Sequence, residues 1–107
     1  MATDKLKQLQ LMEQNMQALG QQKQQFATQL AEAENAEKEL GKSDTAYKIV
    51  GSLMVKAKRE DLLEELGQKK EILNLRVQSI EKQENNLRSK FKALQKEVLE
   101  GMKDERA

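Results

Sequence analysis

Residues 47–56 read Tyr-Lys-Ile-Val-Gly-Ser-Leu-Met-Val-Lys. Two runs of β-favouring residues, 47–50 and 53–56, flank a Gly-Ser pair. A two-residue connection with glycine in first place is typical of a β-hairpin with a type II′ turn. The stretch therefore predicts one hairpin in the middle of the chain.

Both faces of this predicted hairpin are apolar. Pairing around the Gly-Ser turn gives each face three apolar side chains and one lysine; the apolar sets are Val50, Leu53 and Val55, and Tyr47, Ile49 and Met54. An isolated two-stranded hairpin is marginally stable in water, and its two edges are open to pairing. We therefore expect strands and side chains of other chains to cover it. The alternative is a hairpin that folds back on its own helices.

The residues before the hairpin predict a long helix over about residues 4–40. Apolar residues recur there at alternating spacings of three and four, which is the a/d pattern of a coiled coil. The ten positions, of which Lys23 and Glu37 are polar, are Leu9, Met12, Met16, Leu19, Lys23, Phe26, Leu30, Ala33, Glu37 and Leu40. Gly41 is expected to cap this helix, and the linker and hairpin are expected over about residues 41–57.

The residues after the hairpin predict a second helix over about residues 59–104. Its stripe has the same alternating spacing and comprises Leu63, Leu66, Lys70, Leu73, Val77, Ile80, Glu84, Leu87, Phe91, Leu94, Val98 and Gly101. Two long helices joined by a short reversing element are expected to pack antiparallel, with the hairpin at one end and both termini at the other. The predicted fold class is mainly α, an antiparallel two-helix coiled coil with a single central β-hairpin, in one domain over residues 1–107.

Composition and charge exclude several classes of protein. The 107 residues include 19 Lys and Arg against 18 Asp and Glu, and the largest local excess is +3 over residues 41–58. A basic surface for nucleic acid is therefore absent. The longest apolar stretch, 49–55, is far shorter than a membrane span, and residues 1–7 lack the apolar run of a signal peptide. We expect an intracellular, cytoplasmic protein that binds neither membrane nor nucleic acid.

Nothing in the sequence points to catalysis. The chain has no His and no Cys, the residues that most often serve as bases and metal ligands. Gly41-Lys42-Ser43 resembles the end of a phosphate-binding loop, but Ala36 stands where the loop needs its first glycine. We expect no catalytic residue, no metal and no cofactor.

The two ends of the chain carry more apolar side chains than one seam requires. The N-terminal set is Leu6, Leu9, Leu11, Met12 and Met16, and the C-terminal set is Leu94, Val98, Leu99 and Met102. Antiparallel packing brings the two sets together, and methionine suits surfaces that bind varied apolar partners. These nine residues are therefore candidates for binding unfolded polypeptides. The alternative is an ordinary coiled-coil core with frayed ends.

The hairpin motif, Tyr-Lys-x-x-Gly followed by two apolar residues, Val and Lys, resembles that of prefoldin β-type subunits. Further similarity to the archaeal β subunit follows in the second helix, at Glu65-Leu66, Lys70-Glu71, Leu73, Arg76 and Gln83-Glu84. The resemblance covers nearly the whole chain. The single hairpin is typical of the β type, because α-type subunits carry two.

The resemblance implies a chaperone subunit that works without ATP. Prefoldin is a hexamer of two α-type and four β-type subunits, whose hairpins form β-barrels between subunits and whose coiled-coil tips hold unfolded proteins for delivery to a group II chaperonin. On this interpretation the barrel is built by Tyr47, Ile49, Val50, Gly51, Leu53, Met54 and Val55. The nine residues at the chain ends would contact the unfolded protein. The rival hypothesis is a structural or tethering coiled coil that binds no unfolded polypeptide.

Overall fold

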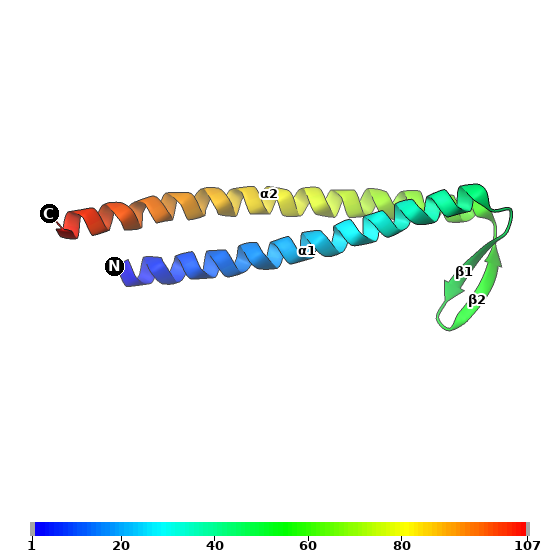
Figure 1. Ribbon diagram of the computed structural model, residues 1–107, viewed down its shortest axis with the longest axis horizontal. Helices are drawn as coiled ribbons and strands as arrows, with labels where there is room; N and C mark the ends of the chain where they lie inside the picture. Colours follow the sequence, from blue (N-terminus) through cyan, green and yellow to red (C-terminus); the bar gives the residue numbers. More distant parts are fainter. Residues whose placement is uncertain (1, 107) are drawn as a thin grey trace. The chain divides into compact units, whose positions relative to one another are not determined.

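The computed structural model describes residues 2–106, and the side chains of residues 3–102. Two long helices flank a two-stranded hairpin in the sequence, in the order α1 (Ala2–Lys42), β1 (Ala46–Val50), β2 (Leu53–Ala57) and α2 (Arg59–Arg106) (Figure 1). The predicted combination of two long helices and one antiparallel hairpin is confirmed. The described chain forms two compact units. The terminal unit contains residues 2–24 and 78–106, and the hairpin unit contains residues 25–77.

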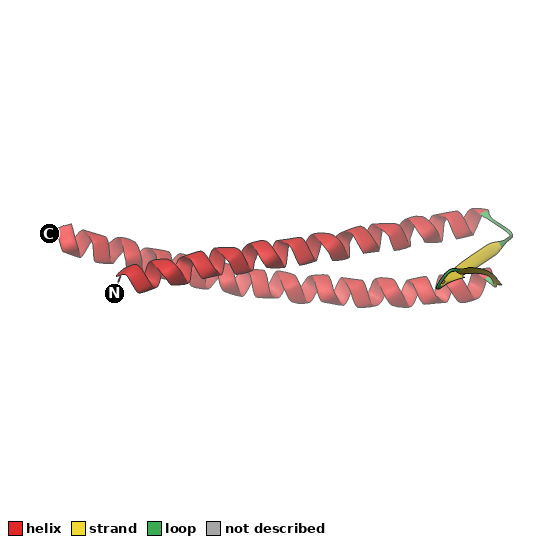
Figure 2. Ribbon diagram, turned by 90° about the horizontal axis from the view of Figure 1, so that it is seen from below, coloured by secondary structure: helices red, strands yellow, loops and turns green. Residues whose placement is uncertain are grey.

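The apolar stripes predicted from the heptad spacing form the contact between the helices in each unit. Every stripe residue from Leu9 to Leu40 is buried or half-buried, and so is every residue of the second stripe except Gly101. In the terminal unit, Ile80 and Val98 are each only 6% exposed. Both views show α1 and α2 running side by side within each unit (Figures 1 and 2). The free energy of folding therefore comes mainly from this single apolar seam.

The hairpin unit has the best buried side chains of the seam. Leu73 is 2% exposed and Ala33 is 3% exposed. The Arg76 guanidinium lies 5.6 Å from the centre of the Phe26 ring, within the range of a cation–π contact. This contact joins α2 to the half-buried Phe26 ring of α1.

The end of α1 differs from the sequence-based expectation. The prediction that Gly41 caps α1 is wrong, because Gly51 is the glycine with a positive φ in the described chain and Gly41 does not adopt the left-handed conformation of a glycine cap. The helix instead runs through Gly41 to Lys42, and the Ser43 N–H donates to the Leu40 carbonyl at 3.4 Å. The positive charge of Lys42, in the last turn, interacts favourably with the negative end of the helix dipole. This interaction stabilises the end of α1 without a glycine cap.

The connections to the hairpin are held by side chains at its base. The Ser43 hydroxyl donates to the Thr45 carbonyl at 2.7 Å and accepts from the Thr45 N–H at 3.3 Å. Arg59, the first residue of α2, donates to the Ser43 carbonyl at 3.4 Å. The two chain segments that enter and leave the hairpin are therefore tied together where β1 begins and α2 starts.

Candidate functional site

The hairpin has the turn and the pairing that the sequence predicts. Val50 pairs with Leu53 across a two-residue turn, and the register continues to Ala46 opposite Ala57. Gly51 has a φ of 60°, whereas no non-glycine residue within residues 2–106 has a positive φ. Glycine first and an ordinary residue second is the pattern of a type II′ turn, since a type I′ turn needs positive φ at both positions.

The register also confirms the assignment of side chains to the two faces. Residues paired across an antiparallel ladder share a face, and successive residues alternate between faces. One face carries the apolar set of Val50, Leu53 and Val55, and the other carries Tyr47, Ile49 and Met54. Lys48 and Lys56 fall on opposite faces, as expected.

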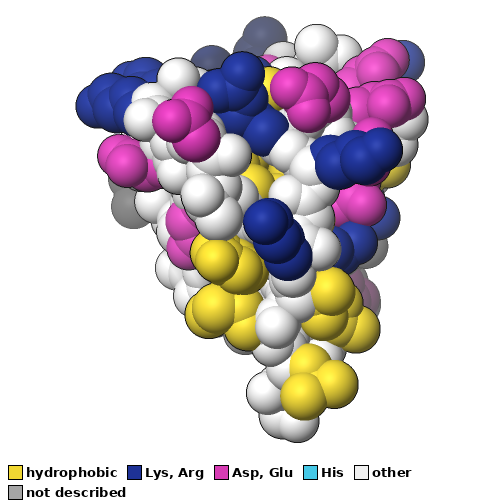
Figure 3. Space-filling view, turned by 90° about the vertical axis from the view of Figure 1, so that its right-hand side faces the viewer, with side chains coloured by type: hydrophobic (Ala, Val, Ile, Leu, Met, Phe, Trp, Pro, Cys, Tyr) yellow, Lys and Arg dark blue, Asp and Glu magenta, His cyan; other side chains and the backbone are white. Residues whose placement is uncertain are grey.

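The chain's own helices leave these six side chains largely uncovered. Their exposed fractions run from 47% at Val55 to 72% at Ile49. Seen from the hairpin end of the molecule, hydrophobic patches lie on the lower part of the surface, below most of the charged side chains in that view (Figure 3). The hairpin is therefore not wrapped by its own helices, and the alternative of a hairpin folded back on them is not what the structure shows.

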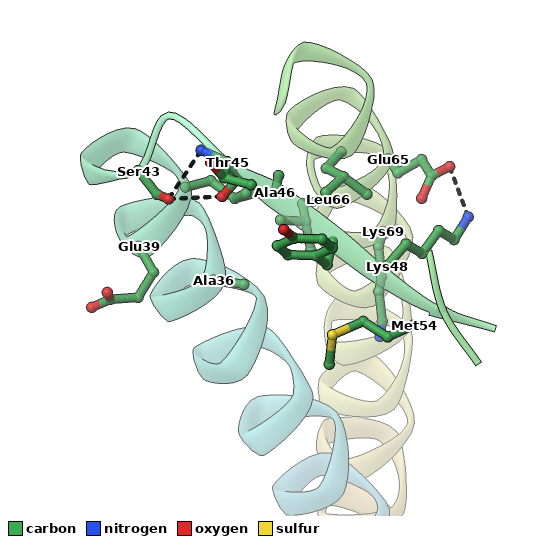
Figure 4. A pocket seen from close by; sticks show the side chains of 13 residues that line it. Ala36, Glu39, Ser43, Thr45, Ala46, Lys48, Met54, Glu65, Leu66 and Lys69 are labelled. Carbon is green, nitrogen blue, oxygen red and sulfur yellow. Dashed lines mark hydrogen bonds and ion pairs between the residues drawn. The ribbon is translucent and has the colours of Figure 1, made fainter. Parts of the chain in front are cut away.

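A groove of about 740 Å³ lies between the hairpin and the two helices of the hairpin unit. Its apolar wall includes Leu40 from α1, Leu62 and Leu66 from α2, and Tyr47 and Met54 from the hairpin. Figure 4 shows two of these side chains, Met54 from β2 and Leu66 from α2, at the groove. The groove can accept apolar side chains that approach along the hairpin face of Tyr47 and Met54.

Charged groups line the rim of the groove. Lys48 Nζ lies 3.0 Å from Glu65 Oε1, and this ion pair links β1 to α2 (Figure 4). Glu39 of α1 and Lys69 of α2 are further charged residues among those that line the groove. An apolar floor with a charged rim is the general composition of a protein interface.

All nine candidate residues at the chain ends lie in the terminal unit, where the structure divides them into two groups. Five belong to the seam: Val98 is buried, and the half-buried members are Leu9, Met12, Met16 and Leu94. The exposed ones are the four outside the stripes, Leu6, Leu11, Leu99 and Met102. A 3.5 Å ion pair between Lys5 of α1 and Glu97 of α2 shows that the two sets lie at the same level of the seam. The structure thus brings the sets together and leaves four apolar side chains available.

Comparison with known proteins identifies the family. The profile of the family described as "Prefoldin subunit" matches residues 3–105. The chain belongs to the prefoldin subunit family. It is 38% identical over 94 residues to the prefoldin subunit beta of Archaeoglobus fulgidus, covering 85% of this chain and 81% of that one. It is also 38% identical over 102 residues to the prefoldin subunit beta of Methanothrix thermoacetophila, covering 92% and 85%.

A solved structure of the family has the same fold. The crystal structure of the prefoldin beta subunit from Thermococcus strain KS-1 matches with a TM-score of 0.88 at 33% identity, covering 94% of this chain and 90% of that one. The resemblance to archaeal prefoldin β-type subunits noted from the hairpin motif is therefore confirmed. Prefoldin subunits are chaperone subunits.

Some exposed and groove residues of this prefoldin-family chain were not predicted from the sequence. Ile72 and Leu75 on α2 are 51% and 60% exposed in the hairpin unit. Leu62, which lines the groove, also stands outside the stripe. Ile72, Leu75 and Leu62 could have been identified in the sequence as apolar residues that do not fit the three-and-four spacing. The Lys48–Glu65 pair gave no such signal, because it joins residues 17 positions apart from different elements.

The described residues contain no cluster of three or more acidic, His or Cys side chains positioned to hold a metal ion. None of the helices, over the part of the chain that is described, has the length and apolarity needed to cross a membrane. What the geometry does offer is apolar contact surface: the two hairpin faces, the groove beside them, and the four exposed side chains of the terminal unit.

Proposed function

We propose that this chain is a subunit of an ATP-independent holdase chaperone, which assembles through its hairpin and binds unfolded polypeptides with the terminal unit. The single observation that carries the proposal is the hairpin with both faces apolar and exposed, in a chain of the prefoldin subunit family. An exposed apolar ribbon with two open edges is a liability for a single chain, because it invites pairing with other strands. Burial by neighbouring subunits removes that liability.

The proposed assembly is a hexamer with α-type subunits, two of them with four β-type chains like this one. Each hairpin contributes two strands to a β-barrel shared between subunits, with one apolar face turned into the barrel. The other face carries Tyr47, Ile49 and Met54. Tyr47 and Met54 line the groove of the same chain, and neighbouring subunits cover the rest of this face, including Ile49. A closed barrel leaves no strand edge open, which is why we propose a barrel rather than an open sheet.

Replacing Ile49 by Asp tests the assembly. Ile49 is 72% exposed in the chain, so Ile49→Asp is expected to leave the helices folded but to prevent the hexamer from forming, because a charge would be buried without a partner. Native mass spectrometry of the variant mixed with an α-type subunit measures the result. The matched control is Ile72→Asp, which changes an exposed isoleucine of α2 outside the hairpin. An intact Ile49→Asp hexamer would count against the assembly.

The exposed side chains of the terminal unit support the site proposed for unfolded polypeptides. Leu6, Leu11, Leu99 and Met102 present apolar surface, and the partly covered methionines Met12 and Met16 belong to the same unit. Flexible, polarisable methionine adapts to apolar segments of different shape. Each contact is weak, but several subunits that grip one polypeptide raise its effective concentration and hence the avidity. Contacts that are individually weak can also let go one by one, so release needs no hydrolysis.

Removing the exposed apolar groups tests this site. We expect a chain with Leu6, Leu11, Leu99 and Met102 all replaced by Ser to assemble normally but to lose suppression of aggregation of a chemically unfolded protein. Deleting residues 1–12 and 95–107 should give the same result. A Leu75→Ser chain is the control, since Leu75 lies in the other unit and is 60% exposed, at least as much as any of the four. Full suppression by the serine variant would place the site elsewhere.

Delivery to a group II chaperonin in the cytoplasm completes the proposal. It is tested by loading the hexamer with a fluorescent unfolded protein and measuring its transfer to the purified chaperonin. Transfer at the same rate without the hexamer would contradict this step.

A tethering coiled coil is less well supported. That function needs an apolar stripe free to pair with a partner helix. Both stripes of this chain are already covered by each other, from Leu9 to Leu40 in α1 and from Leu63 to Val98 in α2. The exposed apolar side chains lie mainly on the hairpin and in the terminal unit.

A further inference from the structure

Four charged residues that interrupt the apolar stripes are paired across the seam. Lys23 Nζ lies 3.0 Å from Glu84 Oε1 in the terminal unit, and Lys70 Nζ lies 3.0 Å from Glu37 Oε2 in the hairpin unit. The exposed fractions of the four side chains run from 14% at Glu84 to 39% at Lys23. Each unit therefore contains one half-buried ion pair, placed where a coiled coil ordinarily has apolar contacts.

The two pairs belong to one register. In both pairs the residue numbers add up to 107, so the same alignment of α1 against α2 forms both. The charged positions are fourteen residues apart in each helix, which is two heptads. Lysine comes first in the chain in both helices, so antiparallel packing sets each lysine opposite a glutamate.

A shift of one heptad in either direction leaves Lys23, Glu37 and Glu84 opposite apolar side chains, and Lys70 opposite Leu30 or opposite Asp44, which lies beyond the end of α1. Apolar stripes alone tolerate such a shift, because it again sets apolar positions against each other. After a seven-residue shift, Lys23 would face Val77 or Phe91. Glu37 would face Leu63 or Val77. A half-buried charge against apolar side chains costs free energy, so the single-heptad shifts are disfavoured.

A shift of two heptads brings like charges together. In one direction Lys23 would face Lys70, and in the other Glu37 would face Glu84. Parallel pairing of two copies of either helix would also set each of these residues against its own kind. Among the native alignment and its one- and two-heptad shifts, only the native one pairs opposite charges at both positions.

We propose that the Lys23–Glu84 and Glu37–Lys70 pairs determine the register in which α1 accepts α2 as its partner. A polar residue at an a position is known to fix the register of a coiled coil at a cost in stability, whereas leucine would pack more tightly there. The proposal goes beyond the assembly and binding functions above and does not depend on them.

The register matters for both ends of the seam. Seven residues of helix correspond to roughly 10 Å along its axis. A shift of that size would break the 3.4 Å hydrogen bond from Arg59 to the Ser43 carbonyl at the base of the hairpin. It would also separate Lys5 from Glu97, and with them the exposed apolar side chains of the two helices in the terminal unit. The ion pairs thus keep both apolar surfaces assembled.

Two variants with the composition of the native chain test the proposal. The first exchanges the charges of α1 alone, Lys23→Glu with Glu37→Lys, so that opposite charges meet only after a fourteen-residue shift. The second adds Lys70→Glu and Glu84→Lys, so that opposite charges meet again in the native register. Both keep net charge and helix propensity the same, and only the pattern of charge across the seam differs.

Engineered cysteines report the register, because the native chain has none. Leu30→Cys with Val77→Cys can close a disulfide in the native register, since these two numbers also add up to 107. Leu30→Cys with Phe91→Cys or Leu63→Cys can do so after a fourteen-residue shift, which moves the helices by about 21 Å. The yield of intramolecular disulfide is read on a denaturing gel, and circular dichroism verifies that each chain is helical.

The native chain and the four-residue exchange are expected to give equal yields of the 30–77 disulfide. The α1 exchange should lower that yield at least tenfold and produce the 30–91 or 30–63 disulfide. An α1 exchange that stays helical with the full 30–77 yield would overturn the proposal, because the apolar packing and the hairpin connection would then set the register alone.

A leucine variant decides the matter if the α1 exchange does not fold. Replacing Lys23, Glu37, Lys70 and Glu84 by Leu should raise the melting temperature, yet lower the 30–77 yield at least twofold as shifted registers become populated. A leucine variant with the full native yield would refute the register role.

Discussion

The hairpin and the helical seam contain the same kinds of side chain, but the chain covers only one of them. In the seam, Leu73 is 2% exposed and Ile80 is 6% exposed. On the hairpin, Ile49 is 72% exposed and Leu53 is 68% exposed. A helix has one apolar stripe, which a single neighbouring helix can cover, whereas the hairpin has two apolar faces. The seam therefore stabilises the chain, and the exposed hairpin is the surface that we propose for contacts with other chains.

The largest contrast is expected between two leucines two positions apart in α2. Leu73→Ala removes a fully covered seam side chain and should lower the free energy of unfolding by about 2 to 4 kcal/mol. Leu75→Ala changes a 60% exposed side chain and should change it by less than about 0.5 kcal/mol. Urea unfolding followed by circular dichroism measures both values. Equal losses at the two positions would show that the seam is not where burial stabilises the chain.

Two glycines should respond in opposite directions to the same substitution. Gly51 has a φ of 60° in the hairpin turn, so Gly51→Ala should strain the turn by about 1 to 2 kcal/mol. Gly67 lies inside α2 with nothing within 4 Å of an added Cβ, so Gly67→Ala should stabilise the helix by about 0.5 to 1 kcal/mol. Thermal unfolding of the isolated chain measures the second effect, and titration of assembly with an α-type subunit measures the first.

The two substitutions are expected to affect different properties of the protein, one its assembly and the other its thermal stability. Gly51→Ala should weaken assembly while leaving the melting temperature of the helices nearly unchanged. Gly67→Ala should raise the melting temperature and leave assembly as it was. A Gly51→Ala chain whose helices melt early would mean that the hairpin contributes to the folding of the chain itself.

The smallest effect is expected at the ion pair between the hairpin and α2. Lys48 and Glu65 are each about half exposed, so Lys48→Ala should cost no more than about 1 kcal/mol, and less as salt is added. Thermal unfolding at low and high salt measures it, with Lys56→Ala on the other hairpin face as control. If Lys48→Ala lowered the free energy of unfolding as much as Leu73→Ala, the view that the chain holds its own hairpin only loosely would be contradicted.

Local patterns in the sequence are sufficient to predict most of this fold. The alternating spacing of three and four marks the seam residues from Leu9 to Val98, and the Gly-Ser pair specifies the hairpin turn and hence both of its faces. The ending of α1 was mispredicted, since glycine allows the left-handed cap but does not require it, and Gly41 stays helical.

Contacts between distant residues were beyond the sequence patterns. Lys23, Glu37, Lys70 and Glu84 stand out as polar exceptions, but their pairing depends on the alignment of two helices, which the spacing of each helix alone does not give. The groove beside the hairpin depends likewise on where the strands stand relative to α1 and α2. The roles of the hairpin in assembly and of the terminal unit in binding unfolded proteins stay predictions.

Hydrogen exchange of the hairpin amides tests most directly whether other subunits cover it. In the isolated chain, diluted until it is monomeric, the outward-facing amides of residues 46–57 should exchange rapidly, while those around Leu73 are protected by the seam. After assembly with an α-type subunit, the hairpin amides should become at least tenfold slower and those of the seam should change little. Hairpin amides that exchange at the same fast rate in the assembled complex would contradict the account.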